Sequence, residues 1–104
     1  MALGKPVIGT AYSGNMDFMN EDNSYLVPYR LIDIDEANGF YNAGGVWADA
    51  DIDAAALVLR DAYLHPEVAA EKGHRAAQFI RDHYNAHIIG SHIAARLRVI
   101  ADRL

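Results

Sequence analysis

The sequence predicts a mixed α/β fold with two short parallel strands and about three to four helices. Short apolar runs bounded by Gly, Pro and Asn fill the first half of the chain, which is typical of strands and turns. From residue 51 onward, apolar residues recur at helical spacing. Two parallel strands cannot cover both of their own faces, so we expect an incomplete sheet.

The first strand is expected over residues 5–10, KPVIGT, a short apolar run that includes Pro6. Gly4, directly before this run, is typical of a residue that ends a helix. Only Met1, Ala2 and Leu3 precede Gly4, which is too short a stretch to form that helix. We therefore expect that most of the helix lies upstream, in a longer chain.

The segment after this strand, YSGNMDFM, is expected to begin one or two helical turns. Ser13 is the expected N-cap, and Asp17 is the acidic residue expected in the first turn. A Gly-rich turn that enters a helix presents free N–H groups, which suit a phosphate or a sugar hydroxyl. Ser13, Gly14 and Asn15 are therefore the candidate ligand-binding residues. The alternative is an ordinary turn with a serine cap.

A second strand is expected over residues 24–29, SYLVPY, where Pro28 either ends the strand or places it at an edge. Residues 31–36, LIDIDE, alternate apolar and acidic side chains, which predicts an exposed strand or an extended loop. The isoleucines of this segment then share its apolar side, and the aspartates face solvent. Residues 37–45 are rich in Asn and Gly and are expected to form a turn region.

Helices are expected at about residues 52–64, 66–83 and 86–104. Their start signals are Asp51 or Asp53, then Pro66, then Asn85. Gly73 is expected to weaken the middle helix by about 1 kcal/mol. The predicted apolar faces are Ile52, Ala55, Leu59 and Ala62 in the first helix, Val68, Ala69, Ala76, Phe79 and Ile80 in the second, and Ile89, Ile93, Leu97, Ile100 and Leu104 in the third.

Composition excludes several classes of function. The chain has 104 residues, a net charge of −5 and no cysteine. Without cysteine there is no disulfide, zinc–thiolate site or cysteine nucleophile. The acidic balance argues against a nucleic-acid partner and an anionic membrane surface. The sequence contains neither an apolar run of about 18 residues, as a membrane span requires, nor a secretory signal, so we expect a cytoplasmic protein.

The aspartates Asp49, Asp51 and Asp53 alternate along the chain. A calcium loop would need a glycine and an acid at the positions that Ala54 and Arg60 occupy, so this reading fails. The pattern instead predicts helix capping.

The histidines raise the possibility of a metal site, because His83 and His87 are four residues apart. Asn85 is expected to start a new helix between them, so His83 and His87 would not lie on the same face of one helix. We therefore expect surface or capping histidines and no metal site.

Aromatic residues gather in the middle third of the chain, where they could stack on a sugar or a base. Packing of loops onto a core is the more common role of such residues. The members of this group are Tyr25, Tyr29, Phe40, Tyr41 and Trp47.

Residues 1–19, MALGKPVIGTAYSGNMDFM, resemble the segment that follows the acidic motif of the retaining glycosyltransferases of family 4, the group 1 glycosyltransferases. In that family a Glu-Ala-Met-Ala helix leads into a Gly-x-Pro-Val-Ile strand and then a Gly-rich turn. Residues 1–8 match the helix end and the strand, and residues 13–15 match the turn. NSYLVP at residues 23–28 matches the next strand. Trp47-Ala48-Asp49 and the terminal KGHRAAQFIRDHY fit the closing elements of the family.

This resemblance implies a two-domain enzyme of the GT-B fold, with residues 1–104 as the C-terminal fragment of its Rossmann-like, nucleotide-sugar-binding domain. The implied substrate is a nucleotide-sugar donor, used with retention and without an essential metal or other cofactor. Ser13, Gly14 and Asn15 would border the donor cleft.

The resemblance also implies what these residues lack. Both glutamates of the family motif, the basic residues that hold the donor diphosphate and the N-terminal acceptor domain would precede Met1. We therefore expect no catalytic residue within the chain and no activity of this segment alone.

A second hypothesis belongs to another class of protein. The chain could be a non-catalytic helical module that forms a homo-oligomer through the apolar stripe of its last helix. An incomplete sheet edge and exposed helix faces favour such pairing.

Overall fold

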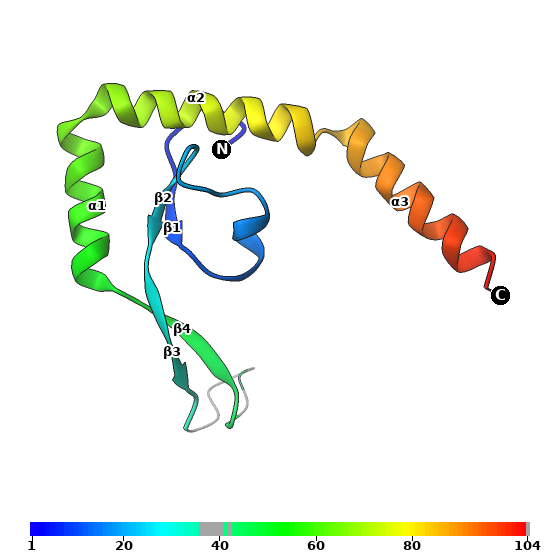
Figure 1. Ribbon diagram of the computed structural model, residues 1–104, viewed down its shortest axis with the longest axis horizontal. Coiled ribbons are helices and arrows are strands. Elements are labelled where there is room, and N and C mark those ends of the chain that lie inside the picture. Colours follow the sequence, from blue (N-terminus) through cyan, green and yellow to red (C-terminus); the bar gives the residue numbers. More distant parts are fainter. Residues whose placement is uncertain (36–40, 42, 104) are drawn as a thin grey trace.

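The computed structural model describes residues 1–35, 41 and 43–103 and has the mixed α/β class that the sequence predicts (Figure 1). Four strands and three α-helices follow one another, with one 3₁₀ turn after the first strand. The elements are β1 (Ile8–Thr10), η1 (Ser13–Asp17), β2 (Tyr25–Val27), β3 (Tyr29–Asp33), β4 (Val46–Ala50), α1 (Ile52–Leu64), α2 (Pro66–His83) and α3 (Ala86–Ala101).

The two predicted strands form a parallel pair, in which Ile8 lies opposite Tyr25 and Thr10 opposite Val27. Pro28 follows β2 directly and separates it from β3, as predicted for a residue that cannot donate to a strand ladder. Tyr25 and Val27 are buried. Each strand of the pair has only three residues, but the second strand, β2, lies in the interior of the protein.

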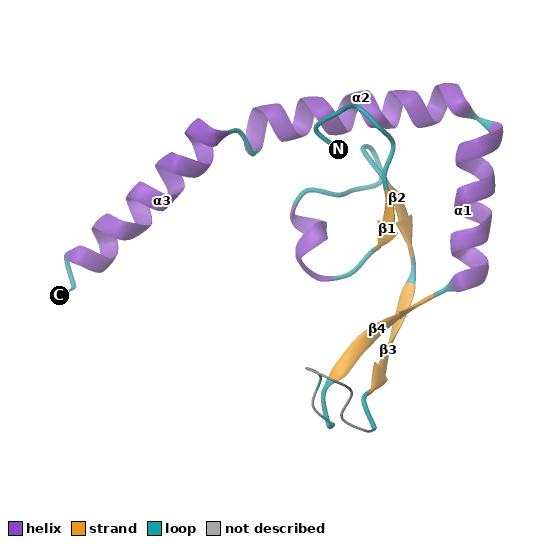
Figure 2. Cartoon of the chain, turned by 180° about the vertical axis from the view of Figure 1, so that it is seen from behind, coloured by secondary structure: helices purple, strands orange, loops and turns teal. Residues whose placement is uncertain are grey.

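An antiparallel hairpin of β3 and β4 extends below the parallel pair (Figure 2). The alternation of residues 31–36 predicted an exposed strand or an extended loop, and β3 extends to Asp33 with Ile34 buried just beyond it. The pairing partner, β4, was not predicted, because its sequence VWADA has two alanines and an aspartate and no clear alternation. The predicted turn at residues 37–45 lies partly outside the described residues.

Helix α1 begins as predicted, with the side chain of Asp51 accepting a hydrogen bond of 2.9 Å from the backbone N–H of Ala54. Its predicted apolar face is partly wrong, because Ile52 is 74% exposed and Leu59 is 58% exposed. The helix packs closely against β2 and α2, and close packing favours small side chains on the inner side. The half-buried residues of α1 are Ala54, Ala55, Val58 and Ala62.

Helix α2 begins with Pro66 at its first position, as predicted, and its buried face consists of Ala69, Gly73, Ala76 and Ala77. Phe79 and Ile80 are half-buried, whereas Val68, placed on the apolar face by the sequence, is 39% exposed.

Gly73 is the point at which α2 meets the N-terminal segment. A Cβ atom at Gly73 would lie 2.3 Å from the carbonyl oxygen of Gly4 and 2.9 Å from its carbonyl carbon. Gly4 itself has a positive φ of 70°, which favours glycine. Gly73 was predicted to weaken the helix, but its position shows why the residue is needed there: only glycine allows this approach.

Two cations of α2 hold the turn that leads into β2. Lys72 donates to the carbonyl oxygens of Glu21 and Ser24, and Arg75 donates to that of Asp22 at 2.6 Å. Asn23 and Ser24, in the same turn, are almost fully buried. The middle of α2 is therefore fixed against the segments that precede both parallel strands.

Helix α3 leads away from this body (Figure 1). Asn85 caps it as predicted, accepting a hydrogen bond of 2.9 Å from the N–H of Ile88. No residue of α3 within the described part of the chain is buried. The radius of gyration is 18.0 Å, whereas about 13 Å is typical of a compact chain of this length. Within the described ranges, no helix is long and apolar enough to cross a membrane.

The contact at Gly73 predicts a large effect of a small substitution. Gly73→Ala is expected to lower the free energy of unfolding by about 1–3 kcal/mol, because the new methyl group must displace the Gly4 backbone. Gly90→Ala, in the open part of α3, is the matched control, since no atom within 4 Å meets a Cβ at that position. Urea unfolding followed by circular dichroism measures both. An equal effect of the two substitutions would contradict the packing described.

Candidate functional site

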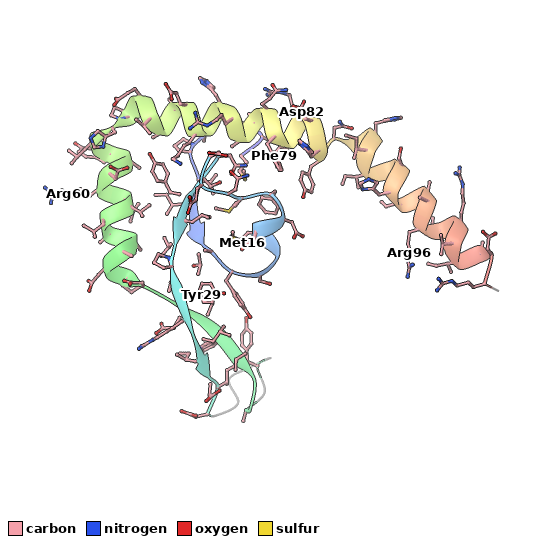
Figure 3. The ribbon with its side chains drawn as sticks, in the orientation of Figure 1. Met16, Tyr29, Arg60, Phe79, Asp82 and Arg96 are labelled. Carbon is pink, nitrogen blue, oxygen red and sulfur yellow. The ribbon has the colours of Figure 1, made fainter. Side chains whose placement is uncertain are left out.

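The candidate ligand-binding residues Ser13, Gly14 and Asn15 lie in η1, directly beyond the C-terminal end of β1. The parallel strands β1 and β2 end on the same edge, so residues 11–15 and 28–29 emerge close together. Figure 3 shows Met16 on η1 and Tyr29 on β3 at this end of the molecule. The candidate site is therefore the C-terminal edge of the parallel pair.

The prediction that Ser13 caps a helix is wrong. The N-cap residue of η1 is Tyr12, whose side chain makes no capping bond. Asp17, expected in the first turn of a helix, is instead the last residue of η1. Ser13 lies inside η1 with a positive φ of 65°. The chain must reverse sharply after β1, and Ser13 takes up the left-handed conformation that this reversal requires.

Asn15 anchors the turn to the strand it follows. Its side-chain N–H group donates to the carbonyl oxygen of Thr10 at 2.8 Å and approaches the sulfur of Met19 at 3.4 Å. The backbone carbonyl oxygen of Asn15 accepts a hydrogen bond of 2.8 Å from the backbone N–H of Met19. The side chain of Met19 packs closely on Gly9: a Cβ atom at Gly9 would lie 3.0 Å from the terminal methyl group of Met19. The side-chain N–H group and the backbone carbonyl oxygen of Asn15 thus both hold the turn in place.

Ser13 and Gly14 are the parts of the turn that a ligand can reach. Both are exposed, and a Cβ at Gly14 would meet no atom within 4 Å. The Ser13 hydroxyl and the backbone of this stretch can hydrogen-bond a sugar hydroxyl or a phosphate oxygen. The turn has only five residues, so its dipole adds little to such binding.

An aromatic pair borders the same edge. The rings of Tyr12 and Tyr29 meet edge to face, with centroids 5.0 Å apart and an angle of 61° between their planes. Tyr12 comes shortly after the end of β1. Tyr29 begins β3, and only Pro28 separates it from the end of β2. The sequence contained a usable signal, since Tyr12 stands just after the first predicted strand and Tyr29 at the end of the second, but the pair was not predicted.

A shallow pocket of about 390 Å³ lies between the base of the hairpin and the start of α1, lined by Pro28, Tyr29, Arg30, Asp49, Ala50, Asp51 and Ile52. Arg30 and Asp49 form an ion pair across β3 and β4, with a distance of 2.9 Å between guanidinium and carboxylate. Asp51 caps α1, and Asp53 lies in its first turn. The three alternating aspartates therefore divide into one cross-strand partner and two helix-start residues.

The predicted aromatic group is not one cluster. Trp47 packs edge to face on Tyr41, with centroids 5.7 Å apart, while Tyr29 contacts Tyr12. Tyr25 is buried in the body under Lys72, and Phe40 lies outside the described residues. No described residue gives the Tyr25 hydroxyl a hydrogen bond. Burial, with smaller contributions from nearby carboxylates, raises the pKa of Tyr25.

The side chains of His65 and His83 contact nearby groups of the chain. His83 ends α2, with Nδ1 3.0 Å from the carbonyl oxygen of Phe79, and His87 belongs to α3. His65 lies 3.0 Å from the carboxylate of Asp61. In the described part of the chain, no three His, Asp or Glu side chains gather as metal ligands would.

Comparison with known proteins adds no relative, because no protein-family model, curated protein or solved structure matches the chain.

The backbone of Ser13 gives a direct test of the turn. Ser13→Gly is expected to raise the free energy of unfolding by about 0.5–1 kcal/mol, because glycine adopts a positive φ without strain. Ser13→Ala is expected to change it little, since Ser13 is exposed and Tyr12, not Ser13, occupies the N-cap position of η1. Thermal and urea unfolding measure both variants. A loss of about 1 kcal/mol in Ser13→Ala would instead indicate a capping serine.

Proposed function

We propose that the chain is the C-terminal segment of a retaining glycosyltransferase of the GT-B fold that transfers a sugar from a nucleotide-sugar donor. One observation carries the proposal: the segment that resembles the group 1 family forms a parallel strand followed by a turn at its C-terminal edge. Ligands of open α/β sheets bind at this edge.

Local geometry supports the same assignment. The resemblance rests on a glycine that ends a helix before the strand, and Gly4 has the positive φ that such a residue adopts. The strand itself, Ile8–Thr10, pairs in parallel with the strand expected from NSYLVP. The turn at Ser13 and Gly14 is exposed beside the tyrosine pair, where a donor sugar or phosphate would be accessible.

The proposed role of these residues is to border the donor cleft, with Ser13 and Gly14 toward the ligand and Asn15 holding the turn. The chemistry would come from the two glutamates of the family motif, which the proposal places before Met1, and the acceptor from an N-terminal domain. The nucleotide sugar is then a substrate, with no further cofactor. The proposal places the enzyme in the cytoplasm.

The proposal predicts the sequence that precedes the Met1 codon. An in-frame Glu-Ala pair is expected there, and the extended protein is expected to transfer sugar from a nucleotide-sugar donor with retention. The 104-residue chain alone is expected to give no transfer. Mass spectrometry of products from a panel of UDP-, GDP- and ADP-sugars measures the activity, and NMR of the product anomer gives the stereochemistry.

The control for this experiment is the extended protein with the glutamate of the Glu-Ala pair replaced by glutamine. Its transfer rate is expected to fall by about 10²-fold or more, because the charge that stabilises the transition state is lost. An upstream sequence without the glutamate, or an extended protein that leaves all of these donors unchanged, would contradict the proposal.

The alternative, a non-catalytic module that dimerises, is favoured by one observation on α3. Its apolar stripe is open to solvent, with Ile93 55% exposed and Leu97 60% exposed. Charge also divides along the chain: three arginines and one aspartate follow residue 85, whereas six basic and thirteen acidic residues precede it. A basic, apolar helix on an acidic body can pair with the body of a second copy.

The module hypothesis predicts a dimer that depends on this stripe. Leu97→Glu is expected to convert the dimer to a monomer, because it places a charge within the buried face. Ala95→Glu makes the same charge change on the opposite side of α3 and is expected to leave the dimer intact. Size-exclusion chromatography with light scattering measures the mass. A wild-type chain that is monomeric at high micromolar concentration would exclude the module.

A further inference from the structure

The junction of α2 and α3 makes a direct contact with the turn of the candidate site. The hydroxyl of Tyr84 donates to the backbone carbonyl oxygen of Asp17 at 2.7 Å. Asp17 is the last residue of η1, and 67 positions separate the two residues in the sequence. This contact is therefore a tertiary one that links the far end of α2 to the turn beyond β1.

Ring packing supports the same contact. Tyr84 meets Phe18 edge to face, with centroids 6.2 Å apart, and lies 6.1 Å from the ring of Phe79. Phe79 also stacks on His83 at 4.3 Å. Figure 3 shows Phe79 on the side of α2 that faces the loop carrying Met16. The hydroxyl of Tyr84 is thus aimed at Asp17 by aromatic neighbours from two separate segments.

The backbone around Tyr84 is itself well defined. The N–H of Tyr84 closes α2 by bonding the carbonyl oxygen of Ile80 at 2.9 Å. The side chain of Asn85 donates to the carbonyl oxygen of Arg81 and accepts from the N–H of Ile88, both at 2.9 Å. Tyr84 therefore lies in a short link that both helices hold.

The turn has two anchors, one at its middle residue and one at its last. Asn15 ties the middle of the turn to the end of β1 through Thr10, and Tyr84 holds its last residue, Asp17. Ser13 and Gly14 are exposed, and a Cβ at Gly14 would meet no atom of the described residues within 4 Å, so their position depends on these anchors. Loss of either anchor frees the part of the turn that a ligand would reach.

We propose that Tyr84 is a positioning residue, which holds the Ser13–Asp17 turn in its ligand-ready place at the C-terminal edge of the parallel strands. That the turn binds a nucleotide sugar rests on the proposed function. That Tyr84 holds the turn in place does not depend on that function.

The structural part is tested in the 104-residue chain by hydrogen exchange. Tyr84→Phe removes the hydroxyl and keeps the ring. Exchange of the N–H groups of Phe18 and Met19, which bond the carbonyl oxygen of Asn15, is expected to accelerate about three- to tenfold. The capped N–H of Ala54 in α1 is expected to stay unchanged.

Tyr63→Phe is the matched control, since Tyr63 is 83% exposed on α1 and its loss also removes one phenolic hydroxyl. It is expected to leave exchange at Phe18 and Met19 unchanged. Equal exchange in Tyr84→Phe and Tyr63→Phe would overturn the role of Tyr84, whatever the activity of the protein.

The functional part is tested in the extended transferase described above. Tyr84→Phe is expected to raise the KM for the nucleotide sugar about three- to tenfold and to leave the KM for the acceptor unchanged. A general loss of structure would change both constants. Faster exchange with an unchanged donor KM would overturn the ligand role of the turn, and absence of transfer by the wild-type extended protein would overturn the proposed function instead.

Discussion

The close approach of Gly73 to Gly4 is the contact on which the rest of the structure depends. It brings the middle of α2 against the residues that precede β1, and Lys72 and Arg75 then reach the carbonyls that precede β2. Helix α2 thus covers the segments that lead into both parallel strands. The C-terminal ends of the two strands are not covered by α2, and η1 and the tyrosine pair lie there.

Local signals in the sequence are sufficient for much of this fold. Pro28 has no backbone N–H and cannot donate to a strand ladder, which accounts for the end of β2 before it. Asp51 and Asn85 cap the helices they precede because the bond each makes is to a residue three positions away. The rest could not be predicted because it depends on tertiary contacts. Gly73 has a distant partner, and the inner face of α1 is set by its distance from β2 rather than by its largest apolar residues.

The candidate site shows the same division. Its place in the chain was predicted from the sequence, since Ser13, Gly14 and Asn15 indicate a turn after a short apolar strand. Its geometry did not, because the left-handed backbone at Ser13 and the bond from Tyr84 to Asp17 arise only when the chain has folded. The proposed donor turn is therefore held both by Asn15, within the turn itself, and by Tyr84, at the end of α2.

The chain consists of a packed body with β1, β2, α1 and α2, the hairpin of β3 and β4 that extends from this body, and the arm α3, which has no buried residue in the described part of the chain. Hydrogen exchange of the wild-type chain, resolved by residue, measures the division most directly. We expect slow exchange at the N–H groups of Ala11 and Tyr25, which bond across the parallel pair, and exchange within seconds along α3. Protection of α3 equal to that of the parallel strands would show that another surface covers α3, and the division into body and arm would be wrong.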